Sequence, residues 1–359
     1  MADGGRRRRR PLIGKLVTGE PFSAHSDPTS ASSTVESMKA AVYYETGGPD
    51  VFRSEDVPDP ELRPSGVIIR VGAVGIQGGD LLHRLSGEMP SRPHIVGYQA
   101  AGVVQAVGDK VTDVAAGDTV VATMGAGSHA ELVSVPERSL WKVPAGMDVT
   151  VAASIPIEFA TADDCLYEFG HLQTGETVLV QAGAGGVGLA AIQLAKAAGA
   201  TVIATASSDD RLDRLTEFGM DHGINYATGD VVSEVLALTD RKGVNLVVDP
   251  VGGRTLEASI AALAYRGRIS WVGRAGREDR PPDIWPIMQR NASITGVFLG
   301  AEMVLNPERT HALVTRLINR VASGELRVVI DRTFPLADAA EAHRYIESRK
   351  AFGRVVLVP

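Results

Sequence analysis

The sequence predicts an α/β protein in which a doubly wound parallel sheet is joined to a small, irregular β-barrel. Three observations support this fold class. Short β-type runs separated by Gly and Pro fill residues 38–160, runs of four to six apolar residues alternate with helical stretches from about residue 161, and a glycine-rich turn follows one of those runs. The second rhythm is typical of a parallel sheet covered by helices on both faces.

The composition limits the classes of protein to which this chain can belong. The chain has 359 residues, enough for two domains with a core each, and 44% of them are hydrophobic. No apolar run is long enough to cross a membrane. The net charge of −7 and the aromatic content of 5% argue against nucleic acid as a partner. Since Cys165 is the single cysteine, we expect no internal disulfide and a reducing, cytoplasmic compartment.

The first 37 residues differ from the rest of the chain. Arg6–Arg10 is an unbroken basic run, and a stretch rich in Ser, Thr and Pro without apolar periodicity follows it. One interpretation is a nucleic-acid arm or a targeting peptide, although the apolar stretch is too short for a signal-peptide core. We favour a disordered N-terminal extension over residues 1–37, because such a composition cannot bury enough apolar surface to become ordered.

Short strands with turn residues between them predict the barrel. They are closely spaced within residues 38–160, a pattern of small antiparallel barrels. The clearest candidates are Val67–Val74, Ala101–Val107 and Gly117–Ala122.

Buried-strand patterns predict the parallel sheet within residues 161–300. Its strand candidates are Val178–Gln181, Val202–Thr205, Leu246–Asp249, Ile269–Val272 and Ile294–Phe298. Residues 301–359 then hold an amphipathic helix pattern and end in a buried-strand pattern that we expect to return to the first domain. We therefore expect residues 38–160 and 301–359 to form one domain, with residues 161–300 inserted as a second.

The glycine-rich turn is the strongest local signal. Gly183, Gly185 and Gly188 match the spacing G-x-G-x-x-G between a predicted strand and an Ala-rich helix predicted over Leu189–Ala198, and Gly186 and Val187 complete the turn. Gly183 suits a tight turn, Gly185 lets backbone approach a pyrophosphate, and Gly188 lets helix and strand pack closely. The free N–H groups at the start of the helix favour phosphates. Residues 161–300 are therefore predicted to bind a dinucleotide.

The residues after the second strand predict which dinucleotide binds. An NAD site has an acidic side chain there for the ribose, whereas this chain has Ser207 and Ser208, with Arg211 close behind. Two hydroxyls and a guanidinium suit a 2′-phosphate. Asp209 and Asp210 complicate this choice, since a carboxylate turned inward would repel the phosphate, but acidic residues also suit the first turn of a helix. We predict NADPH, with NADH as the alternative.

With these residues in view, the chain resembles the medium-chain dehydrogenase/reductase superfamily, in its zinc-free quinone oxidoreductase (zeta-crystallin-like) branch. The resemblance runs from Met38 to the C-terminus. It implies a Rossmann domain, a GroES-like catalytic domain and a homodimer that pairs through the edge strand Ile294–Phe298. Its motifs are Gly117-Asp-Thr-Val120, Ala184-Gly-Gly-Val-Gly188, Gly223-Ile-Asn-Tyr226, Asp249-Pro-Val-Gly-Gly253 and Gly353-Arg-Val-Val356.

The resemblance also implies cofactor residues. Tyr226 and Arg211 match the family's residues near the 2′-phosphate, and Thr161 matches the threonine that borders the nicotinamide. Further candidate cofactor residues lie at the carboxyl ends of the last two predicted strands of the sheet: Val272, Gly273 and Phe298.

The positions of the family's catalytic zinc ligands carry other residues here. Gln77 stands where the zinc-dependent relatives have Cys, and Tyr98 where they have His. Gly79 stands where they have the hydroxyl residue that relays the alcohol proton. An amide and a phenol do not make the tetrahedral site that catalytic zinc needs. We therefore expect no metal.

Without metal, the cofactor carries the chemistry and the protein supplies position and electrostatics. We expect hydride transfer to a small electrophilic acceptor, either a quinone or the β-carbon of an α,β-unsaturated carbonyl compound. The developing oxyanion needs donors, and the Gln77 amide and the Tyr98 hydroxyl are the best candidates. The proton donor stays open.

Two pairs of residues leave alternatives. Asp163 and Asp164 stand where apolar groups would line the cleft, so either is a candidate general acid with a pKa raised by burial. The other interpretation is that they cap a helix or face solvent. His83 and Trp285 are further cleft candidates that we interpret as packing residues.

Two rival functions are consistent with the sequence. One is an enoyl-thioester or enone reductase, and the other is a non-enzymatic NADPH-binding or RNA-binding protein, for which Arg6–Arg10 is the best support.

Overall fold

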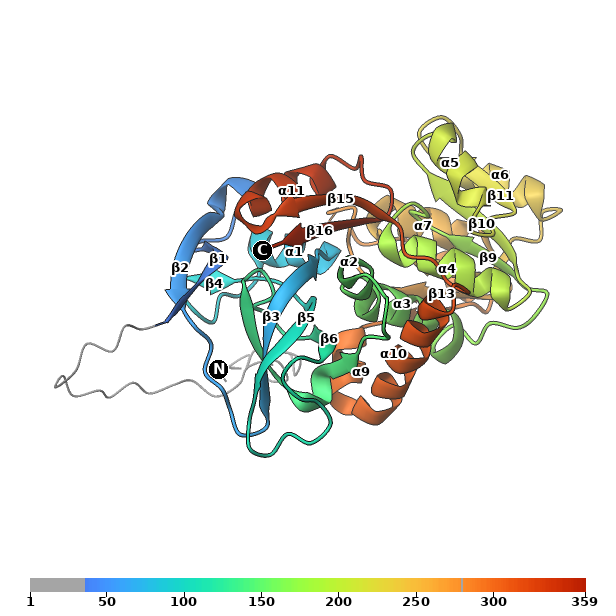
Figure 1. Ribbon diagram of the computed structural model, residues 1–359. Coiled ribbons are helices and arrows are strands. Elements are labelled where there is room, and N and C mark those ends of the chain that lie inside the picture. The colour runs from blue at the N-terminus through green and yellow to red at the C-terminus, as the bar shows by residue number, and fades with distance from the viewer. Residues whose placement is uncertain (1–35, 279) are drawn as a thin grey trace, which may run out of the picture.

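The computed structural model describes residues 36–278 and 280–359, and it confirms the predicted fold class (Figure 1). Residues 1–35 of the predicted N-terminal extension lie outside the described residues. The first strand begins at Ser37, which pairs with Pro58. Among the described residues, no helix has the length and apolar character needed to cross a bilayer.

Six parallel strands form one sheet, in the order β11-β10-β9-β12-β13-β14. The strand order reverses beside β9, which creates the crevice where such sheets bind ligands. The short strand β11 was not predicted, because only Ile224 in it is a buried apolar residue. The strands are β9 (Thr177–Val180), β10 (Thr201–Ala206), β11 (His222–Asn225), β12 (Val244–Asp249), β13 (Leu263–Trp271) and β14 (Ser293–Gly296).

Helices cover both faces of this sheet. In β9, Val178 and Val180 pack into one core with α3 and α4, while Leu179 packs into another core with α6 and α7. The alternation explains why each strand appears in the sequence as a continuous apolar run. These helices are α3 (Pro156–Asp163), α4 (Gly186–Ala197), α5 (Asp209–Thr216), α6 (Val231–Leu238), α7 (Gly253–Ala261) and α8 (Trp285–Gln289).

The barrel combines the two ends of the described chain. The C-terminal strand β16 pairs antiparallel with β3 and parallel with β15, so the red and blue segments of Figure 1 share a sheet. Its strands are β1 (Ser37–Tyr43), β2 (Arg53–Pro58), β3 (Gly66–Gly75), β4 (His94–Ile95), β5 (Gln99–Val107), β6 (Thr119–Thr123), β7 (Leu132–Pro136), β8 (Leu140–Lys142), β15 (Ile330–Pro335) and β16 (Arg354–Val358).

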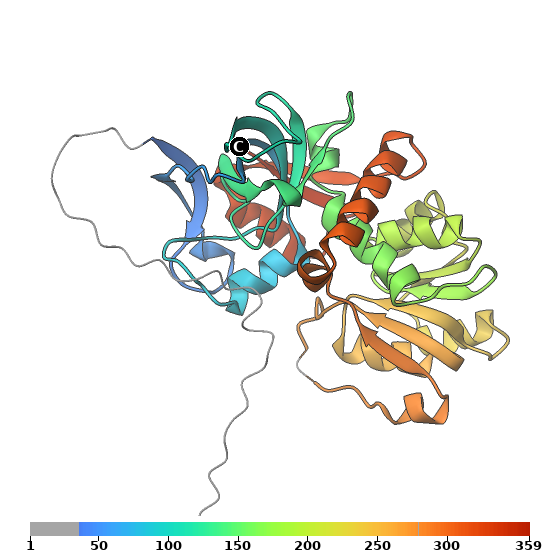
Figure 2. The ribbon, with the colours of Figure 1, turned by 90° about the horizontal axis from the view of Figure 1, so that it is seen from below.

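Short helices complete the barrel, and one long helix joins it to the parallel sheet. Figure 2 shows the two parts side by side with α10 between them. Trp141 of β8 donates from Nε1 to the carbonyl of His311 in α10 at 3.0 Å. The helices are η2 (Pro49–Val51), α1 (Gly78–Ser86), η3 (Glu137–Ser139), α2 (Val149–Ala152), the π-helix η4 (Asp164–Glu168), α9 (Leu299–Leu305), α10 (Pro307–Ala322), η5 (Leu336–Asp338) and α11 (Ala339–Glu347).

Candidate active site

The glycine-rich turn contains two glycines at which a side chain would clash and one at which a side chain would have room. A Cβ on Gly188 would lie 2.4 Å from the carbonyl oxygen of Ala182, and a Cβ on Gly183 would lie 2.9 Å from Leu215 Cδ1. A Cβ on Gly185 would meet only the Ala182 oxygen, at 3.4 Å, and Gly185 is exposed. The helix α4 begins at Gly186, three residues before the predicted start. The turn therefore fits a phosphate beside Gly185 and the N-terminus of α4.

A chain of buried hydrogen bonds supports the start of this turn. Ser259 donates to Asp249 at 2.8 Å, Gln181 donates to Ser259 at 3.1 Å, and Thr205 donates to Gln181 at 2.9 Å. The backbone N–H of Ala182, a residue with φ of 53°, donates to the Thr205 hydroxyl at 3.1 Å. The three central strands are therefore linked at their carboxyl ends, at the start of the glycine-rich turn.

The predicted 2′-phosphate residues gather at the end of β10. Ser207 and Ser208 follow the strand, and Ser208 precedes α5. The backbone N–H of Tyr226 donates to the Ala206 carbonyl at 3.1 Å, and the Tyr226 side chain is 45% exposed. Asp209, which complicated the cofactor choice, accepts a bond from Asn225 Nδ2 at 2.8 Å. Asp209 therefore has a hydrogen-bond partner within the protein.

Arg211 has partners that the sequence did not indicate. Its guanidinium donates to the carbonyls of Arg349, Lys350 and Ala351, at 2.9, 2.5 and 2.9 Å. These bonds bring the loop before β16 to the end of β10. Arg349 and Lys350 are two further basic residues at this edge, and no local sequence signal connected them with the cofactor.

The remaining cofactor candidates lie on three different elements. Val272 follows β13, and its N–H donates to the Asp249 carbonyl at 2.9 Å. The Gly273 carbonyl accepts a bond from Trp271 Nε1 at 2.8 Å. Phe298 precedes α9 and is 62% exposed, whereas Thr161 is buried in α3. Their contacts with a cofactor stay predictions.

A buried carboxylate joins the barrel to the glycine-rich turn. Glu158 of α3 accepts bonds from Gln77 Nε2 at 2.6 Å and Gln99 Nε2 at 3.0 Å, and it forms an ion pair with Arg354. A Cβ on Gly186 would lie 2.7 Å from both Glu158 Cγ and Arg354 Nη1. The four side chains, called here the Glu158 cluster, therefore lie against the first residue of α4.

Gln77 consequently has a second role besides the predicted one. One N–H of its amide is engaged by Glu158, and the side chain is buried. Its backbone N–H donates to Asp80 Oδ2 at 2.7 Å, which starts α1. Gln77 therefore links the start of α1 to the Glu158 cluster. Its donation to an oxyanion stays a prediction.

Tyr98 lies against Gly79, two residues after Gln77. A Cβ on Gly79 would be 2.8 Å from Tyr98 Cε2, so the ring occupies the space of a side chain at residue 79. The hydroxyl lies 3.1 Å from His83 Nδ1. Burial raises the pKa of the Tyr98 hydroxyl above its usual value, and the Asp80 carboxyl raises it further. Tyr98 is therefore a hydrogen donor rather than an anionic base.

A buried polar group lies behind Tyr98. Burial raises the pKa of Asp80 to about 8, although the Gln77 N–H opposes the shift. Burial lowers the pKa of His94 to about 4, and His83 lowers it further. Within the described residues, Asp80 Oδ1, His94 Nε2 and the Tyr43 hydroxyl have no hydrogen-bond partner. Internal water is the ordinary partner of such groups.

The structure corrects both interpretations of Asp163 and Asp164. Neither lines the site as an acid, and neither faces solvent as a cap. Asp163 is bonded to Arg316 at 3.0 Å and Asp164 to Arg309 at 2.8 Å. Both pairs connect α3 and η4 to α10. The distant arginines could not be paired with them from the sequence.

The structure corrects the interpretation of Trp285 as a packing residue, whereas the ring of His83 stacks on that of His94. His83 contacts Tyr98, and Trp285 is 60% exposed on α8.

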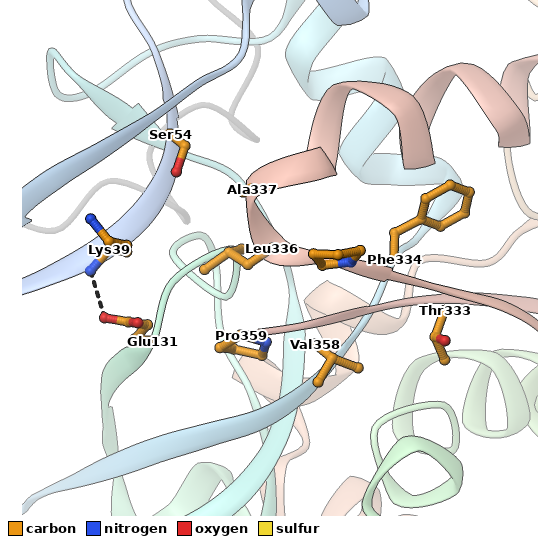
Figure 3. A pocket seen from close by; sticks show the side chains of 10 residues that line it. Lys39, Ser54, Glu131, Thr333, Phe334, Leu336, Ala337, Val358 and Pro359 are labelled. Carbon is orange, nitrogen blue, oxygen red and sulfur yellow. Dashed lines mark hydrogen bonds between the residues drawn. The ribbon is translucent and has the colours of Figure 1, made fainter.

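A separate groove lies at the C-terminal edge of the barrel (Figure 3). It contains Phe334 and Leu336 of the 334–337 segment and the chain end at Pro359, with Lys39 and Glu131 at its rim. The Lys39 backbone N–H donates to the Glu131 carboxylate at 2.7 Å. None of the predicted site residues line it, so it is not the candidate active site. In the part of the chain that the structure describes, no three His, Cys, Asp or Glu side chains are grouped to hold a metal ion.

Comparison with known proteins finds two matching family models. The profile of the alcohol dehydrogenase GroES-like domain matches residues 63–145, and that of the zinc-binding dehydrogenase family matches residues 186–301. A quinone oxidoreductase of Pseudomonas aeruginosa is 35% identical, covering 87% of this chain and 97% of its own length. A 2-haloacrylate reductase of Burkholderia sp is 33% identical, covering 90% and 99%.

A solved structure is similar over the same range. The crystal structure of Escherichia coli quinone oxidoreductase complexed with NADPH has a TM-score of 0.85 and 28% sequence identity, covering 89% of this chain and all of that chain.

Proposed function

Because this chain belongs to the medium-chain dehydrogenase/reductase superfamily, in its quinone oxidoreductase branch, we propose that it transfers a hydride from NADPH to a quinone or an α,β-unsaturated carbonyl compound. One observation carries the proposal. The Glu158 cluster contacts α4 at Gly186, next to the open position at Gly185, and its Gln99 follows the donor Tyr98 in the sequence. NADPH, when bound, supplies the hydride, and the chain's residues hold the phosphates and the acceptor oxygen.

The acceptor oxygen gains negative charge as the hydride arrives on carbon. Tyr98 carries the hydrogen that this oxygen needs, and the pKa of its hydroxyl is raised, so it stays protonated between reactions. Gln77 has one further amide hydrogen beyond the bond to Glu158. The reduction of 2-haloacrylate, a conjugated acid, by a relative supports a conjugated C=C acceptor beside quinones.

The proposed reaction uses no zinc. Gln77 is bonded to Glu158, and the Tyr98 ring occupies the space beside Gly79. Neither residue offers the imidazole or thiolate that zinc prefers. Extensive chelation is therefore expected to leave turnover unchanged, and loss of activity restored only by zinc would contradict this.

The test of the proposed function is steady-state turnover of a panel of quinones, enones and enoyl thioesters with NADPH or NADH. We expect turnover of at least one acceptor, with NADPH preferred. Tight NADPH binding without turnover of any acceptor would favour a binding protein and refute the enzyme.

We also propose a homodimer that pairs through β14. This strand is an edge of the parallel sheet, and the unpaired backbone groups of an open edge can pair with a second copy of the chain. Ile284, Trp285 and Met288 on the neighbouring α8 segment are each more than half exposed. A monomer in sedimentation analysis would contradict the proposal.

A further inference from the structure

The hydrogen bonds of His83 determine where its hydrogens lie. His83 Nε2 is 2.6 Å from the Glu88 carbonyl oxygen, and His83 Nδ1 is 3.1 Å from the Tyr98 hydroxyl. A carbonyl can only accept, so Nε2 carries a hydrogen. In a neutral ring Nδ1 is then the acceptor, and Tyr98 donates its hydrogen to it.

The charge of His83 therefore controls the direction in which Tyr98 donates. When His83 is neutral, the hydroxyl hydrogen is directed at Nδ1 and away from an acceptor. When His83 is protonated, Nδ1–H donates to the Tyr98 oxygen, and the hydroxyl hydrogen is released for another partner. Tyr98 can serve a developing oxyanion fully only in the second state.

We propose that His83 supplies, through Tyr98, the proton that completes reduction of the acceptor, an inference that rests on the proposed function. The hydride leaves NADPH with its electron pair and bonds to the acceptor carbon, and the carbonyl electrons move to oxygen. The Tyr98 O–H bond breaks as the acceptor O–H bond forms. The His83 Nδ1–H bond breaks as the Tyr98 O–H bond forms again. NADP⁺, the protonated product and a neutral His83 result.

The ionisable groups around His83 are mostly uncharged near pH 7, so His83 is the group that gains and loses the proton in the proposed reaction. The ring of His94 stacks on it at 5.0 Å, and the low pKa of His94 keeps that ring neutral near pH 7. Asp80, with a pKa of about 8, is mostly protonated at that pH. Tyr43 and Arg84 lie further behind, near Asp80. His83 itself is partly buried on α1, so solvent can return the proton after each reaction.

Two glycines fix the geometry of this pair. A Cβ on Gly87 would lie 2.2 Å from His83 Cδ2, so the absence of a side chain there lets the chain fold tightly against the imidazole. Gly79 leaves the space that the Tyr98 ring fills. Because residue 79 has no hydroxyl, the route to the acceptor runs through Tyr98.

The test is the pH dependence of kcat with NADPH and an acceptor that the wild-type enzyme turns over. Wild-type kcat should fall as pH rises, because the proposed proton source is the protonated form of His83. His83→Gln keeps a hydrogen-bonding side chain but carries no charge, so its kcat should be about a hundredfold lower and lose this pH dependence. The KM for NADPH should not change. His222→Gln, on the exposed end of β11, is the matched control and should keep the wild-type profile.

The two residues act in series, which gives a second measurement. Tyr98→Phe should lower kcat about as much as His83→Gln, and the double variant should be no slower than either single variant. A wild-type pH profile in His83→Gln, or losses that multiply in the double variant, would overturn the inference. If His83→Gln does not fold, persistence of the pH dependence in Tyr98→Phe overturns it. Failure of the wild-type enzyme to reduce any acceptor refutes the proposed function instead, and this inference with it.

Discussion

The glycine-rich turn and the Glu158 cluster lie against each other, yet they are built in different ways. The turn consists of six consecutive residues, 183–188, and its predicted contacts with a phosphate are made by backbone atoms. The cluster takes one side chain each from four segments, with Gln77 before α1, Gln99 in β5, Glu158 in α3 and Arg354 in β16. A site made of consecutive residues leaves a pattern in the sequence, whereas a site made by tertiary contact leaves none.

The largest expected effect comes from breaking the cluster. Glu158→Ala would leave the Arg354 guanidinium buried without its carboxylate, and would leave the Gln77 and Gln99 amides without an acceptor. Removing one partner of a buried ion pair costs about 3–5 kcal/mol. We expect a loss of this size in the free energy of unfolding, measured with urea in the absence of cofactor.

Two variants control this measurement. Glu158→Gln keeps the shape and one acceptor, so its loss should be smaller. Asp50→Ala breaks an exposed ion pair with Arg344, and it should change stability little. Equal effects of Glu158→Ala and Asp50→Ala would mean that the cluster is not a stabilising unit.

The second prediction concerns pH and the buried carboxyl at the edge of the cluster. The folded-state pKa of Asp80 is about 8, above the unfolded value of about 3.9. The folded protein therefore keeps a proton that the unfolded chain has lost, and stability falls as pH rises between these two values. The limiting slope is about 1.4 kcal/mol per pH unit.

Asp80→Asn should remove this slope. Its stability relative to wild type should increase from pH 6 to pH 8 and stay constant at higher pH, as followed by urea unfolding at each pH. The exposed Asp213→Asn on α5 is the control and should track wild type throughout. A constant difference between Asp80→Asn and wild type over this range would show that Asp80 has no raised pKa.

The third prediction separates two glycines of the turn. A methyl group on Gly188 would collide with backbone at 2.4 Å, and overpacking of this kind costs about 1–3 kcal/mol. Gly188→Ala should therefore unfold more easily. Gly185→Ala meets only one oxygen, at 3.4 Å, so its unfolding should resemble wild type while its affinity for NADPH falls at least about tenfold, because the methyl group occupies the phosphate position. If Gly185→Ala bound NADPH normally, the phosphate would not lie there.

These contrasts explain what the sequence could predict. The fold class followed from strand and helix rhythms, and the turn followed from its spacing. The boundaries of individual elements were predicted less accurately. The helix α4 begins at Gly186 rather than at Leu189, and the strand β11 was not predicted. These elements depend on packing by neighbours rather than on their own residues.

Pairs of residues far apart in the sequence could not be predicted for a related reason. Asp163 and Asp164 looked like candidate acids because the arginines that bind them, Arg316 and Arg309, lie about 150 positions away in the sequence. Arg354 was visible only as part of a motif, with no sign of its partner Glu158. His83 was assigned to packing, since its contact with Tyr98 depends on how α1 meets the start of β5.

The smallest expected effect combines local and long-range features at the cofactor edge. Arg211 follows β10 in the pattern expected for a 2′-phosphate site, but its guanidinium also holds the loop that carries Arg349 and Lys350. Arg211→Ala should therefore weaken a charge-assisted contact that NADPH alone can use. We expect the KM for NADPH to rise about tenfold, which corresponds to about 1.4 kcal/mol, while the KM for NADH hardly changes.

A neighbouring residue provides the control for loop anchoring. Arg214 lies on the same helix with its guanidinium 3.6 Å from the centre of the Phe352 ring, so Arg214→Ala loosens the same loop from a point further along α5. If Arg211 acts through the phosphate, Arg214→Ala should leave the ratio of the two KM values near that of wild type. If it acts only by anchoring the loop, both variants should change that ratio alike, or raise both KM values together. Tyr226→Phe removes a single hydroxyl from the same edge and should shift the preference in the same direction by less, because a neutral hydrogen bond contributes less than a charged one. A wild-type enzyme that prefers NADH would instead assign Asp209 or Asp210 to the ribose, and the local pattern at β10 would have been misinterpreted.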